Sequence, residues 1–541
     1  MFRRWLPLRS ALGNSPGGLS GRVVIALLLT GLALSVAGDQ APANAEDAPA
    51  EFDWVSQFGT SERDEALGVG VDSSGTYVAG TTRGGLGSPN LGGFDAFVRK
   101  YDHTGNEVWT RQFGTADSDS VGDIYAGFGG VYVVGNTLGA FVGEDNLGGL
   151  DIFIRKYDLN GNQQWTDQFG TTGGEYPDAV SADSTGVYVV GHTDGVLPGQ
   201  ANLGSRDAFI RKYDHDGTVL WTRQFGTSGM DDVLDVSVDT SGVYLSGETR
   251  GAFPGFSNAG EDDGFVRKYD SNGLEEWTVQ FGTSSSDAPF GISVNSGALY
   301  VGGTTRGTFT ADSNLGEADV FLRKYQLDGT EVWTRQFGFA GYDEIFGVAA
   351  TPSAVYISGI VSGTLPGQIS AGGWDAFVRE YDHDGNELRT RQFGTSSDDQ
   401  GLRIAANSDG VYAVGSVDAG AIPGGSSSGG PDGYIVKLLP VGMITGTITE
   451  SAKERPLKGA VVNTSRGQSA ITDRRGNYTL ERVLYGYQTF TAAKDGYTTQ
   501  TKHMTVDADV PMEMNFVLES AQKGGGGGPD CDKHSTHPKC Q

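Results

Sequence analysis

The feature that most constrains this chain of 541 residues is an internal repeat of about 56 residues. A Gln-Phe-Gly tripeptide, a Tyr followed three residues later by Gly, and an Asp-x-aromatic motif each occur seven times. The tripeptides begin at Gln57, Gln112, Gln168, Gln224, Gln280, Gln336 and Gln392. A fixed period of this length is typical of architectures in which each unit packs on its neighbours.

Each repeat contains four short candidate strands. In one repeat these are residues 233–239, 243–247, 265–269 and 276–281, and the last two are separated by the turn sequence Asp270-Ser271-Asn272-Gly273. Asn-Gly and Asp-Gly are strong hairpin signals because both residues tolerate positive φ. Four antiparallel strands in each unit, repeated around an axis, predict a β-propeller.

The two ends of the repeat region complement each other. The first Gln-Phe-Gly has no three strands before it, and the last repeat stops near Leu438 after its third strand. Residues 52–58 are therefore expected to form the outermost strand of the blade built from residues 399–438, which removes open edges from the ring. The prediction is an all-β, seven-bladed propeller over residues 46–440, closed by the N-terminal strand.

The repeat resembles the bacterial SBBP family of seven-bladed β-propeller repeats. The resemblance rests on Trp221 to Thr227, on Gly242 to Tyr244 with Gly247, and on Asp263 to Tyr269, and it covers about residues 52–438. It implies the fold and an exported, bacterial setting, but no reaction. Two copies depart from the pattern, since Arg389 replaces the strand-four Trp and Val436 replaces the strand-three Arg.

After Pro440 the repeat ends and a second pattern begins. Its segments are Met443 to Thr449, Leu457 to Val462, Thr472 to Leu480 and Lys494 to Tyr497. Residues 441–519 resemble the carboxypeptidase regulatory-like domain, a transthyretin-like fold. The resemblance implies a small β-sandwich that serves as an accessory module without catalytic residues.

Both termini carry signals of export. Arginines, an apolar run over residues 23–37 and Ala43-Asn44-Ala45 predict a signal peptide at 1–45, with an uncleaved anchor as the alternative. Cleavage leaves no stable membrane anchor and places the protein outside the cytoplasm, as a secreted, periplasmic or cell-surface protein. Residues 520–541 form a Gly-rich linker and a tail in which Cys531 and Cys540 are expected to form a disulfide. A Cys/His metal site with His534 and His537 is the alternative.

The predicted propeller is strongly acidic. Residues 46–440 hold 23 Lys and Arg against 55 Asp and Glu, a formal charge of −32. Such a charge disfavours nucleic acid and anionic membranes as partners.

Two sets of carboxylates recur with the repeat. One lies five residues after each Gln-Phe-Gly, at Asp64, Asp119, Glu175, Asp231, Asp287, Asp343 and Asp399. The other begins strand three, at Asp95, Asp151, Asp207, Asp263, Asp319, Asp375 and Asp432. If strand one is innermost, the first set rings the channel mouth and the second lies roughly 10 Å further out. Such rings are able to bind Ca²⁺, but their presence in every repeat favours a structural role.

Positions that vary between repeats are the better candidates for a ligand site. The residue before the strand-three Asp lies in the long, Gly-rich loop, of the kind that carries function. Four of these residues, Phe94, Arg206, Asp262 and Trp374, are candidates for ligand binding. Trp374 is the first candidate for stacking on a ligand, and a packed loop tryptophan is the competing explanation.

The function remains open between two classes. No Gly-x-Ser-x-Gly, His-Glu-x-x-His or phosphate-binding-loop motif occurs, and no catalytic residue or cofactor other than Ca²⁺ is predicted. The favoured class is a non-catalytic binding or scaffold protein whose rim engages a carbohydrate, a protein or a cell-surface polymer. The alternative is an extracellular propeller enzyme, a hydrolase or lyase that acts on polysaccharide.

Overall fold

The structure is a computed structural model that describes residues 52–295, 297–309, 316–339, 341–438, 441–451, 454–465, 467–484, 486–506 and 511–521. Within these ranges the regular secondary structure is β-strand throughout, and no helix is long and apolar enough to cross a membrane. The expected signal peptide and the predicted Cys531–Cys540 disulfide lie outside the described residues.

Six antiparallel sheets are each built from four consecutive strands. Blade 1 comprises β2 (Asp64–Asp72), β3 (Gly75–Thr82), β4 (Asp95–Tyr101) and β5 (Glu107–Phe113). Blade 2 comprises β6 (Asp119–Gly127), β7 (Gly130–Thr137), β8 (Asp151–Tyr157) and β9 (Gln163–Phe169). Blade 3 comprises β10 (Glu175–Asp183), β11 (Gly186–Thr193), β12 (Asp207–Tyr213) and β13 (Val219–Phe225).

The next three blades repeat the pattern. Blade 4 comprises β14 (Asp231–Asp239), β15 (Gly242–Thr249), β16 (Asp263–Tyr269) and β17 (Glu275–Phe281). Blade 5 comprises β18 (Asp287–Asn295), β19 (Ala298–Thr305), β20 (Asp319–Gln326) and β21 (Glu331–Phe337). Blade 6 comprises β22 (Asp343–Ala350), β23 (Val355–Val361), β24 (Asp375–Tyr381) and β25 (Glu387–Phe393).

Blade 7 is assembled from both ends of the repeat region. Its strand order is β1 (Phe52–Phe58), β28 (Asp432–Leu438), β27 (Gly410–Val417) and β26 (Asp399–Asn407). Ser56 pairs with Ile435 and Gln57 with Tyr434 across the antiparallel β1–β28 ladder. The predicted closure is therefore confirmed.

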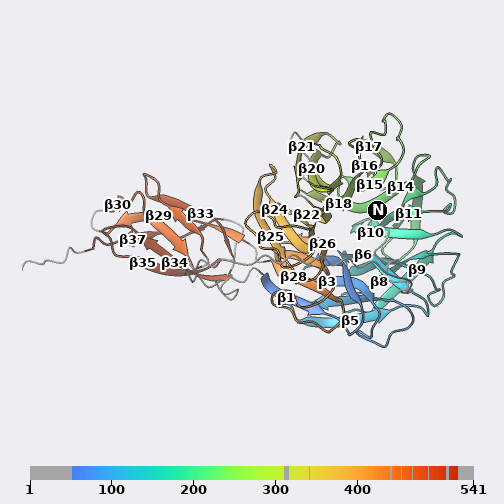
Figure 1. The fold of residues 1–541 in the computed structure, drawn as a ribbon, viewed down its shortest axis with the longest axis horizontal. Coiled ribbons are helices and arrows are strands. Elements are labelled where there is room, and N and C mark those ends of the chain that lie inside the picture. Colours follow the sequence, from blue (N-terminus) through green and yellow to red (C-terminus); the bar gives the residue numbers. More distant parts are fainter. Residues whose placement is uncertain are drawn as a thin grey trace, which may run out of the picture. The chain divides into compact units, whose positions relative to one another are not determined.

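The first strand of each blade is the innermost. Each of these strands contacts the first strand of the next blade, and β26 contacts β2, so the series closes into a ring. Figure 1 shows the blades around a common axis, from blue at β1 to orange at β28. The strands begin earlier than expected, because the carboxylate position belongs to the ladder: Asp231 pairs with Thr249. The predicted fold class, a seven-bladed propeller, is confirmed.

A tryptophan on strand four holds six of the seven blades to the next. The indole Nε1 of Trp221 donates to the carbonyl oxygen of Ser271 at 3.3 Å, in the β16–β17 hairpin turn of the following blade. A Cβ at Gly273 of that turn would lie 2.9 Å from the ring, and Gly273 has a φ of 77°. Glycine is required there both for the left-handed backbone and for the close approach of the indole.

A second interblade contact joins the Phe of Gln-Phe-Gly to an arginine. The guanidinium of Arg211 on β12 lies 3.7 Å from the centroid of Phe169 on β9 of the preceding blade. Equivalent stacks join Arg99 to Phe58, Arg155 to Phe113, Arg267 to Phe225, Arg323 to Phe281 and Arg379 to Phe337. The repeated aromatic and cationic residues are thus explained by packing between blades.

The seam between blades 6 and 7 departs from this pattern. Blade 7 has no hairpin between strands three and four, because β28 and β1 come from opposite ends of the propeller chain. On blade 6, Arg389 stands where the Trp would contact that turn, and Glu380 stands where a Lys such as Lys212 donates to a turn carbonyl. On blade 7, Val436 replaces the Arg, and Phe52 instead packs edge-on against Phe393 at 5.1 Å.

The C-terminal domain consists of two further sheets. One holds β29 (Val441–Glu450), β30 (Arg455–Pro456), β33 (Asn477–Leu484), β36 (Met512–Glu513) and β37 (Phe516–Leu518). The other holds β32 (Ser469–Ile471), β31 (Val461–Thr464), β34 (Gly486–Ala493) and β35 (Gln500–Val506). Ile444, Ile448 and Leu480 of the first sheet share a buried cluster with Val462 and Phe490 of the second. This is the small β-sandwich that the sequence predicts.

Ring closure can be tested by comparing two truncated chains. A chain that starts at residue 59 lacks β1, whereas one that starts at residue 52 keeps it. The shorter chain should lose roughly 3 kcal/mol or more of unfolding free energy, because the β28 ladder and its packing are removed. Urea unfolding followed by tryptophan fluorescence measures this, and equal midpoints would contradict the role of β1.

The tryptophan contact can be tested with a matched pair of variants. Trp221→Ala should lower the unfolding free energy by roughly 2–4 kcal/mol, because a half-buried indole leaves a void at the seam. Arg389→Ala, at the equivalent place on blade 6, should produce a smaller loss, since no β28–β1 hairpin covers it. The same urea titration measures both losses of unfolding free energy. Equal losses would show that the contact with the turn does not account for the effect of Trp221→Ala.

Candidate functional site

The strand-four glutamine fastens the long loop between strands two and three. Gln224 donates through Nε2 to Asp207 Oδ2 at 2.7 Å and to the Gly195 carbonyl at 3.0 Å. Its Oε1 accepts a hydrogen bond from the Leu197 amide at 2.9 Å. Three equivalent hydrogen bonds, to a loop carbonyl, to the strand-three Asp and from a loop amide, are made in the other blades by Gln57, Gln112, Gln168, Gln280, Gln336 and Gln392. The rim that carries these loops is therefore held rigidly in every blade.

The strand-three carboxylates also accept backbone hydrogen bonds from the loops. Asp207 Oδ2 accepts from the Leu203 amide at 2.9 Å, and Asp95, Asp151, Asp263, Asp375 and Asp432 have equivalent bonds. The loop before Asp319 includes residues outside the described ranges. These bonds are those expected of a structural role.

The strand-one carboxylates are completely buried. Asp231 Oδ2 accepts from the Thr227 amide at 2.6 Å, within the connection that leads from the preceding blade. Each of the other six accepts the amide of the residue four positions earlier: Asp64, Asp119, Glu175, Asp287, Asp343 and Asp399. All seven have zero exposed surface.

The expectation of two separate acidic rings, one of them lining the channel mouth, is wrong. A Cβ at Gly114 would lie 2.7 Å from Asp119 Oδ2 and 2.7 Å from Asp95 Oδ1. The strand-three Asp of one blade thus lies beside the strand-one carboxylate of the next blade, at the Gly of Gln-Phe-Gly. The expectation failed because it measured the separation within one blade, whereas the two side chains meet across the seam.

Burial raises the pKa of the strand-one aspartates. Desolvation raises the pKa of Asp119 and Asp343 to about 6 and that of Asp399 to about 7, although hydrogen bonds from the loop oppose the rise. The neighbouring strand-three carboxylate raises each pKa further. No group of three or more His, Cys, Asp or Glu residues in the described ranges could hold a metal ion. Binding of Ca²⁺ stays a prediction.

The channel along the axis is filled on one side by apolar side chains. Leu234, Phe290, Phe346 and Leu402, from the first strands of blades 4 to 7, belong to one buried cluster. Arg403 on β26 crosses the axis, where its guanidinium donates to the carbonyl oxygens of Phe346 at 2.7 Å and Asp178 at 3.1 Å. The channel at this level is a packed core.

A polar and aromatic cluster lies at the mouth on the blade 3 side. His192 Nδ1 lies 3.0 Å from Asp178 Oδ2, and its ring stacks on Tyr176 with centroids 4.9 Å apart. The guanidinium of Arg206 lies over the Tyr176 ring, 5.5 Å from its centroid. Burial opposes the imidazolium, but the carboxylates of Asp232 and Asp178 outweigh it and raise the pKa of His192.

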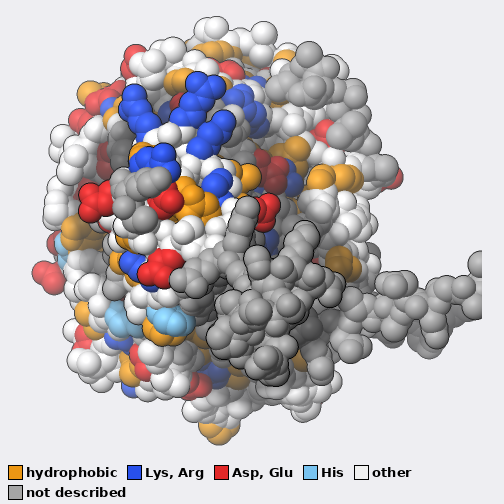
Figure 2. Space-filling model, turned by 90° about the vertical axis from the view of Figure 1, so that its left-hand side faces the viewer, with side chains coloured by type: hydrophobic (Ala, Val, Ile, Leu, Met, Phe, Trp, Pro, Cys, Tyr) orange, Lys and Arg blue, Asp and Glu red, His pale blue; other side chains and the backbone are white. Residues whose placement is uncertain are grey.

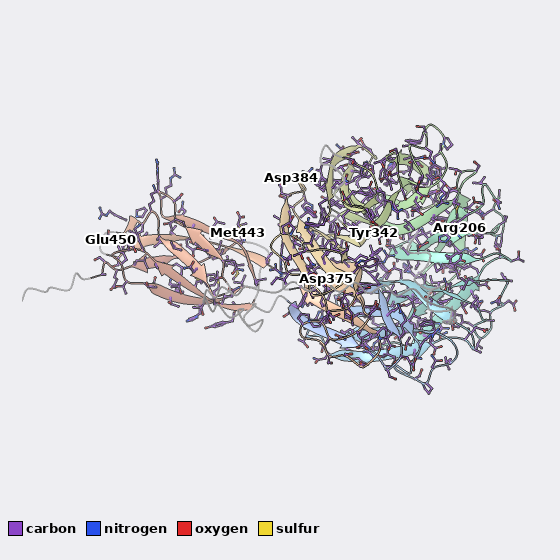
Figure 3. The ribbon with its side chains drawn as sticks, in the orientation of Figure 1. Arg206, Tyr342, Asp375, Asp384, Met443 and Glu450 are labelled. Carbon is purple, nitrogen blue, oxygen red and sulfur yellow. The ribbon has the colours of Figure 1, made fainter. Side chains whose placement is uncertain are left out.

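A second cluster, contributed by blades 5 and 6, contains Trp374. Its indole stacks on Tyr342 with centroids 6.3 Å apart and planes 14° apart. Arg306 donates to the Tyr342 hydroxyl at 2.9 Å and covers its ring. Trp374 is half-buried and also packs against the apolar cluster of the channel. Figure 3 places Tyr342 near the axis of the propeller, and Asp384, in the β24–β25 turn, at its periphery.

The four candidate residues do not form one cluster. Arg206 belongs to the blade 3 group, where it also pairs with Asp194 at 2.8 Å, and Trp374 belongs to the blade 5 and 6 group. Phe94 is buried, and the Arg83 guanidinium lies over its ring, 4.4 Å from the ring centroid. Asp262 on blade 4 forms an ion pair with Arg250 at 2.7 Å.

Sequence reasoning missed Tyr176, His192, Asp178, Tyr342 and Arg306. For Tyr176 a signal was available, because the residue after each strand-one carboxylate varies while the carboxylate itself recurs. These residues are Glu65, Ser120, Tyr176, Asp232, Ala288, Glu344 and Gln400. Successive side chains of a strand point to opposite faces, so this position is directed away from the buried carboxylate pair.

Comparison with protein families identifies the second domain. Residues 443–519 match the carboxypeptidase regulatory-like domain. The carboxypeptidase regulatory-like domain expected at the C-terminus is therefore present.

Comparison of the whole chain finds one distant curated relative. The chain is 26% identical over 389 residues, 63% of its length, to the "Regulatory protein FlaEY" of Caulobacter vibrioides. The chain spans 40% of that relative's length.

The solved propellers that resemble the chain have low TM-scores and low sequence identity to it. The WD40 domain of Neurospora crassa Pan2 has a TM-score of 0.40 and 9% identity, covering 70% of this chain and 89% of that one. The WD40 propeller domain of Doa1 has a TM-score of 0.40 and 10% identity, covering 71% and 96%. The propeller fold is therefore assigned from the chain's own strand order.

The rigidity of the rim can be tested through its glutamine. Gln224→Met should leave the Leu197 amide without its acceptor, which costs about 1–3 kcal/mol, and should remove one of the two donors to Asp207 Oδ2. Hydrogen exchange at the Leu197 amide should accelerate, and stability should fall. Gln164→Met, at an exposed position, is the control. Unchanged exchange in the Gln224 variant would show that the loop is held by other contacts.

Proposed function

We propose that the chain is an exported, non-catalytic binding or scaffold protein whose propeller rim engages a carbohydrate, a protein or a cell-surface polymer. The observation that carries the proposal is the pair of aromatic–guanidinium clusters at the channel mouth, Tyr176 with Arg206 and Tyr342 with Arg306. They occupy positions where the repeat does not dictate the residue, and Arg206 and Arg306 lie in the strand two to strand three loops that the glutamines fasten. Aromatic faces and guanidinium groups are common anchors in recognition sites.

Charge narrows the class of partner. A propeller with a formal charge of −32 does not favour the phosphate backbone of nucleic acid. The acidity is confined to the propeller, because residues 441–541 hold 12 Lys and Arg against 11 Asp and Glu. Figure 2, in which the C-terminal domain faces the viewer, shows a group of Lys and Arg side chains among scattered Asp and Glu. Neutral glycans and proteins with mixed surfaces are therefore the better candidates.

The N-terminus and the relative support the setting. The apolar run at 23–37 and Ala43-Asn44-Ala45 support export by a cleaved signal peptide, and an oxidising compartment favours a Cys531–Cys540 disulfide. The similarity to a Caulobacter protein supports a bacterial origin, and the seven in-register repeats support the proposed SBBP repeat type. That relative is named a regulatory protein, which supports action through binding a partner.

The alternative, a propeller enzyme on polysaccharide, draws support from one contact. His192 is oriented by Asp178, as a general base is oriented by a carboxylate. Among the described residues, the hydrogen-bond partner of His192 is this carboxylate and not a nucleophilic hydroxyl. The alternative therefore needs a water nucleophile at the mouth.

The binding proposal can be tested on a glycan array of bacterial exopolysaccharide and lipopolysaccharide fragments, probed with the labelled protein. Trp374→Ala should weaken binding at least tenfold while leaving the circular dichroism and melting temperature close to wild type, because the indole is only half-buried. Leu274→Ala is the control, since Leu274 is 69% exposed in the β16–β17 turn of the opposite rim. Weakened binding in the Leu274→Ala control alone would place the site on the rim of the hairpin turns and contradict the proposal.

The same glycans separate the two classes. A binding protein should leave them intact on prolonged incubation, as judged by mass spectrometry. Cleavage that is abolished by His192→Gln would establish the enzyme instead.

A further inference from the structure

The buried carboxylates of the propeller form seven pairs, one at each seam between blades. Each pair combines the Asp that begins strand three with the carboxylate that begins strand one of the next blade. The pairs are Asp432 with Asp64, Asp95 with Asp119, Asp151 with Glu175, Asp207 with Asp231, Asp263 with Asp287, Asp319 with Asp343, and Asp375 with Asp399.

Both carboxyl groups of a pair lie against the glycine of the Gln-Phe-Gly between them. A Cβ at Gly394 would lie 2.7 Å from Asp375 Oδ1 and 2.5 Å from Asp399 Oδ2. At Gly226 the corresponding distances are 3.1 Å to Asp207 Oδ1 and 2.6 Å to Asp231 Oδ2. In each case the space that a side chain would need is occupied by carboxyl oxygens from two blades, which explains why glycine follows Gln-Phe in every repeat.

One oxygen of the strand-three carboxyl lacks a donor. Its Oδ2 accepts from the loop amide and from the strand-four glutamine. Its Oδ1 is buried and accepts no hydrogen bond from the described residues in Asp95, Asp151, Asp207, Asp375 and Asp432. A buried carboxylate oxygen without a donor is costly, and two buried carboxylates side by side cannot both ionise cheaply.

We propose that each pair shares one proton between its two carboxyl groups, so that an O–H···O bond joins adjacent blades. The proton supplies the missing donor for Oδ1 and removes one of two like charges. It would reduce the negative charge of the folded propeller by as many as seven. The pairs therefore act as pH-sensitive clasps along all seven seams, the closing seam of Asp432 and Asp64 included.

The surrounding charges support the placement of this proton. The charged group that acts on Asp119 is Asp95. Asp343 faces Asp319 and also Arg379, which partly offsets it. Asp399 faces Asp375 and Asp418, with the Tyr434 hydroxyl nearby. Two carboxylates acting on Asp399 agree with its pKa being raised the furthest, to about 7.

The direction of the pH dependence follows from these raised values. In the unfolded chain such carboxyl groups ionise near their ordinary pKa of 3.8. Stability from the shared protons is therefore fully present below about pH 4 and is lost as the pH rises through 6 to 7. Blade seams should loosen toward alkaline pH.

Asp375→Asn tests the clasp directly. The Asn Oδ1 can accept the hydrogen bonds from the Ala371 amide and Gln392 that Asp375 Oδ2 accepts now, at 3.0 Å and 2.7 Å. Its Nδ2 then takes the place of Asp375 Oδ1 and donates to Asp399 without any proton. The variant should release one proton fewer than the wild type when unfolded at pH 6. Its urea midpoint should also fall less between pH 5 and pH 8.

The control is Asp216→Asn in an exposed turn, and all titrations are made at high ionic strength to screen long-range charge. The wild type alone should release several protons on unfolding at pH 6. Absence of proton release, or an unchanged pH dependence in Asp375→Asn, overturns the proposal. So does recovery of stability at pH 8 on adding Ca²⁺, which would assign the pairs to a cation. If Asp375→Asn fails to fold, Asp95→Asn provides the same comparison at the blade 1 to blade 2 seam.

Discussion

The contact between the outer strand of one blade and the next blade is the interaction on which the propeller depends. A single four-stranded sheet leaves two apolar faces uncovered, so each blade is stable only between its neighbours. Strand four supplies two side chains to this contact: the Trp beneath the turn glycine and the Phe beneath the next blade's guanidinium. Between them along the strand, the Gln ties the loop of its own blade to the strand-three Asp. These are the residues of the repeated Trp-Thr-x-Gln-Phe-Gly segment, which explains why it recurs.

The departures from the repeat follow from the same constraint. Arg389, Glu380 and Val436 all lie at the seam where blade 7 lacks a hairpin between strands three and four. With no turn to contact, the tryptophan and the lysine have nothing to bind there. Phe52, at the start of β1, packs on Phe393 in place of the missing arginine stack. An irregular copy in this chain thus records the place where the two ends of the ring meet.

The sequence predicts the number of blades, their closure and the Asp-x-x-Gly hairpin turns, because period, incomplete ends and turn residues are local or regularly spaced. It does not predict that Asp95 and Asp119 meet, since that requires the angle and separation of neighbouring blades. The contact of Arg403 with the Asp178 carbonyl joins residues 225 positions apart across the axis. No spacing rule reaches such a pair. The sequence prediction concerned the residue before strand three, whereas Tyr176 follows the strand-one carboxylate Glu175 and Tyr342 precedes the strand-one carboxylate Asp343.

The propeller divides its residues between two tasks. Whatever recurs in all seven blades, including the buried carboxyl pairs and the glutamines, serves the seams and the loops. A seven-fold device of this kind cannot by itself recognise an asymmetric ligand. The mouth breaks the symmetry, because blades 3, 4 and 6 carry Tyr176, Asp232 and Glu344 where blades 2 and 5 carry Ser120 and Ala288. The apolar cluster and Arg403 join blades across the axis, so a ligand at the mouth would meet an unequal set of aromatic, charged and small side chains.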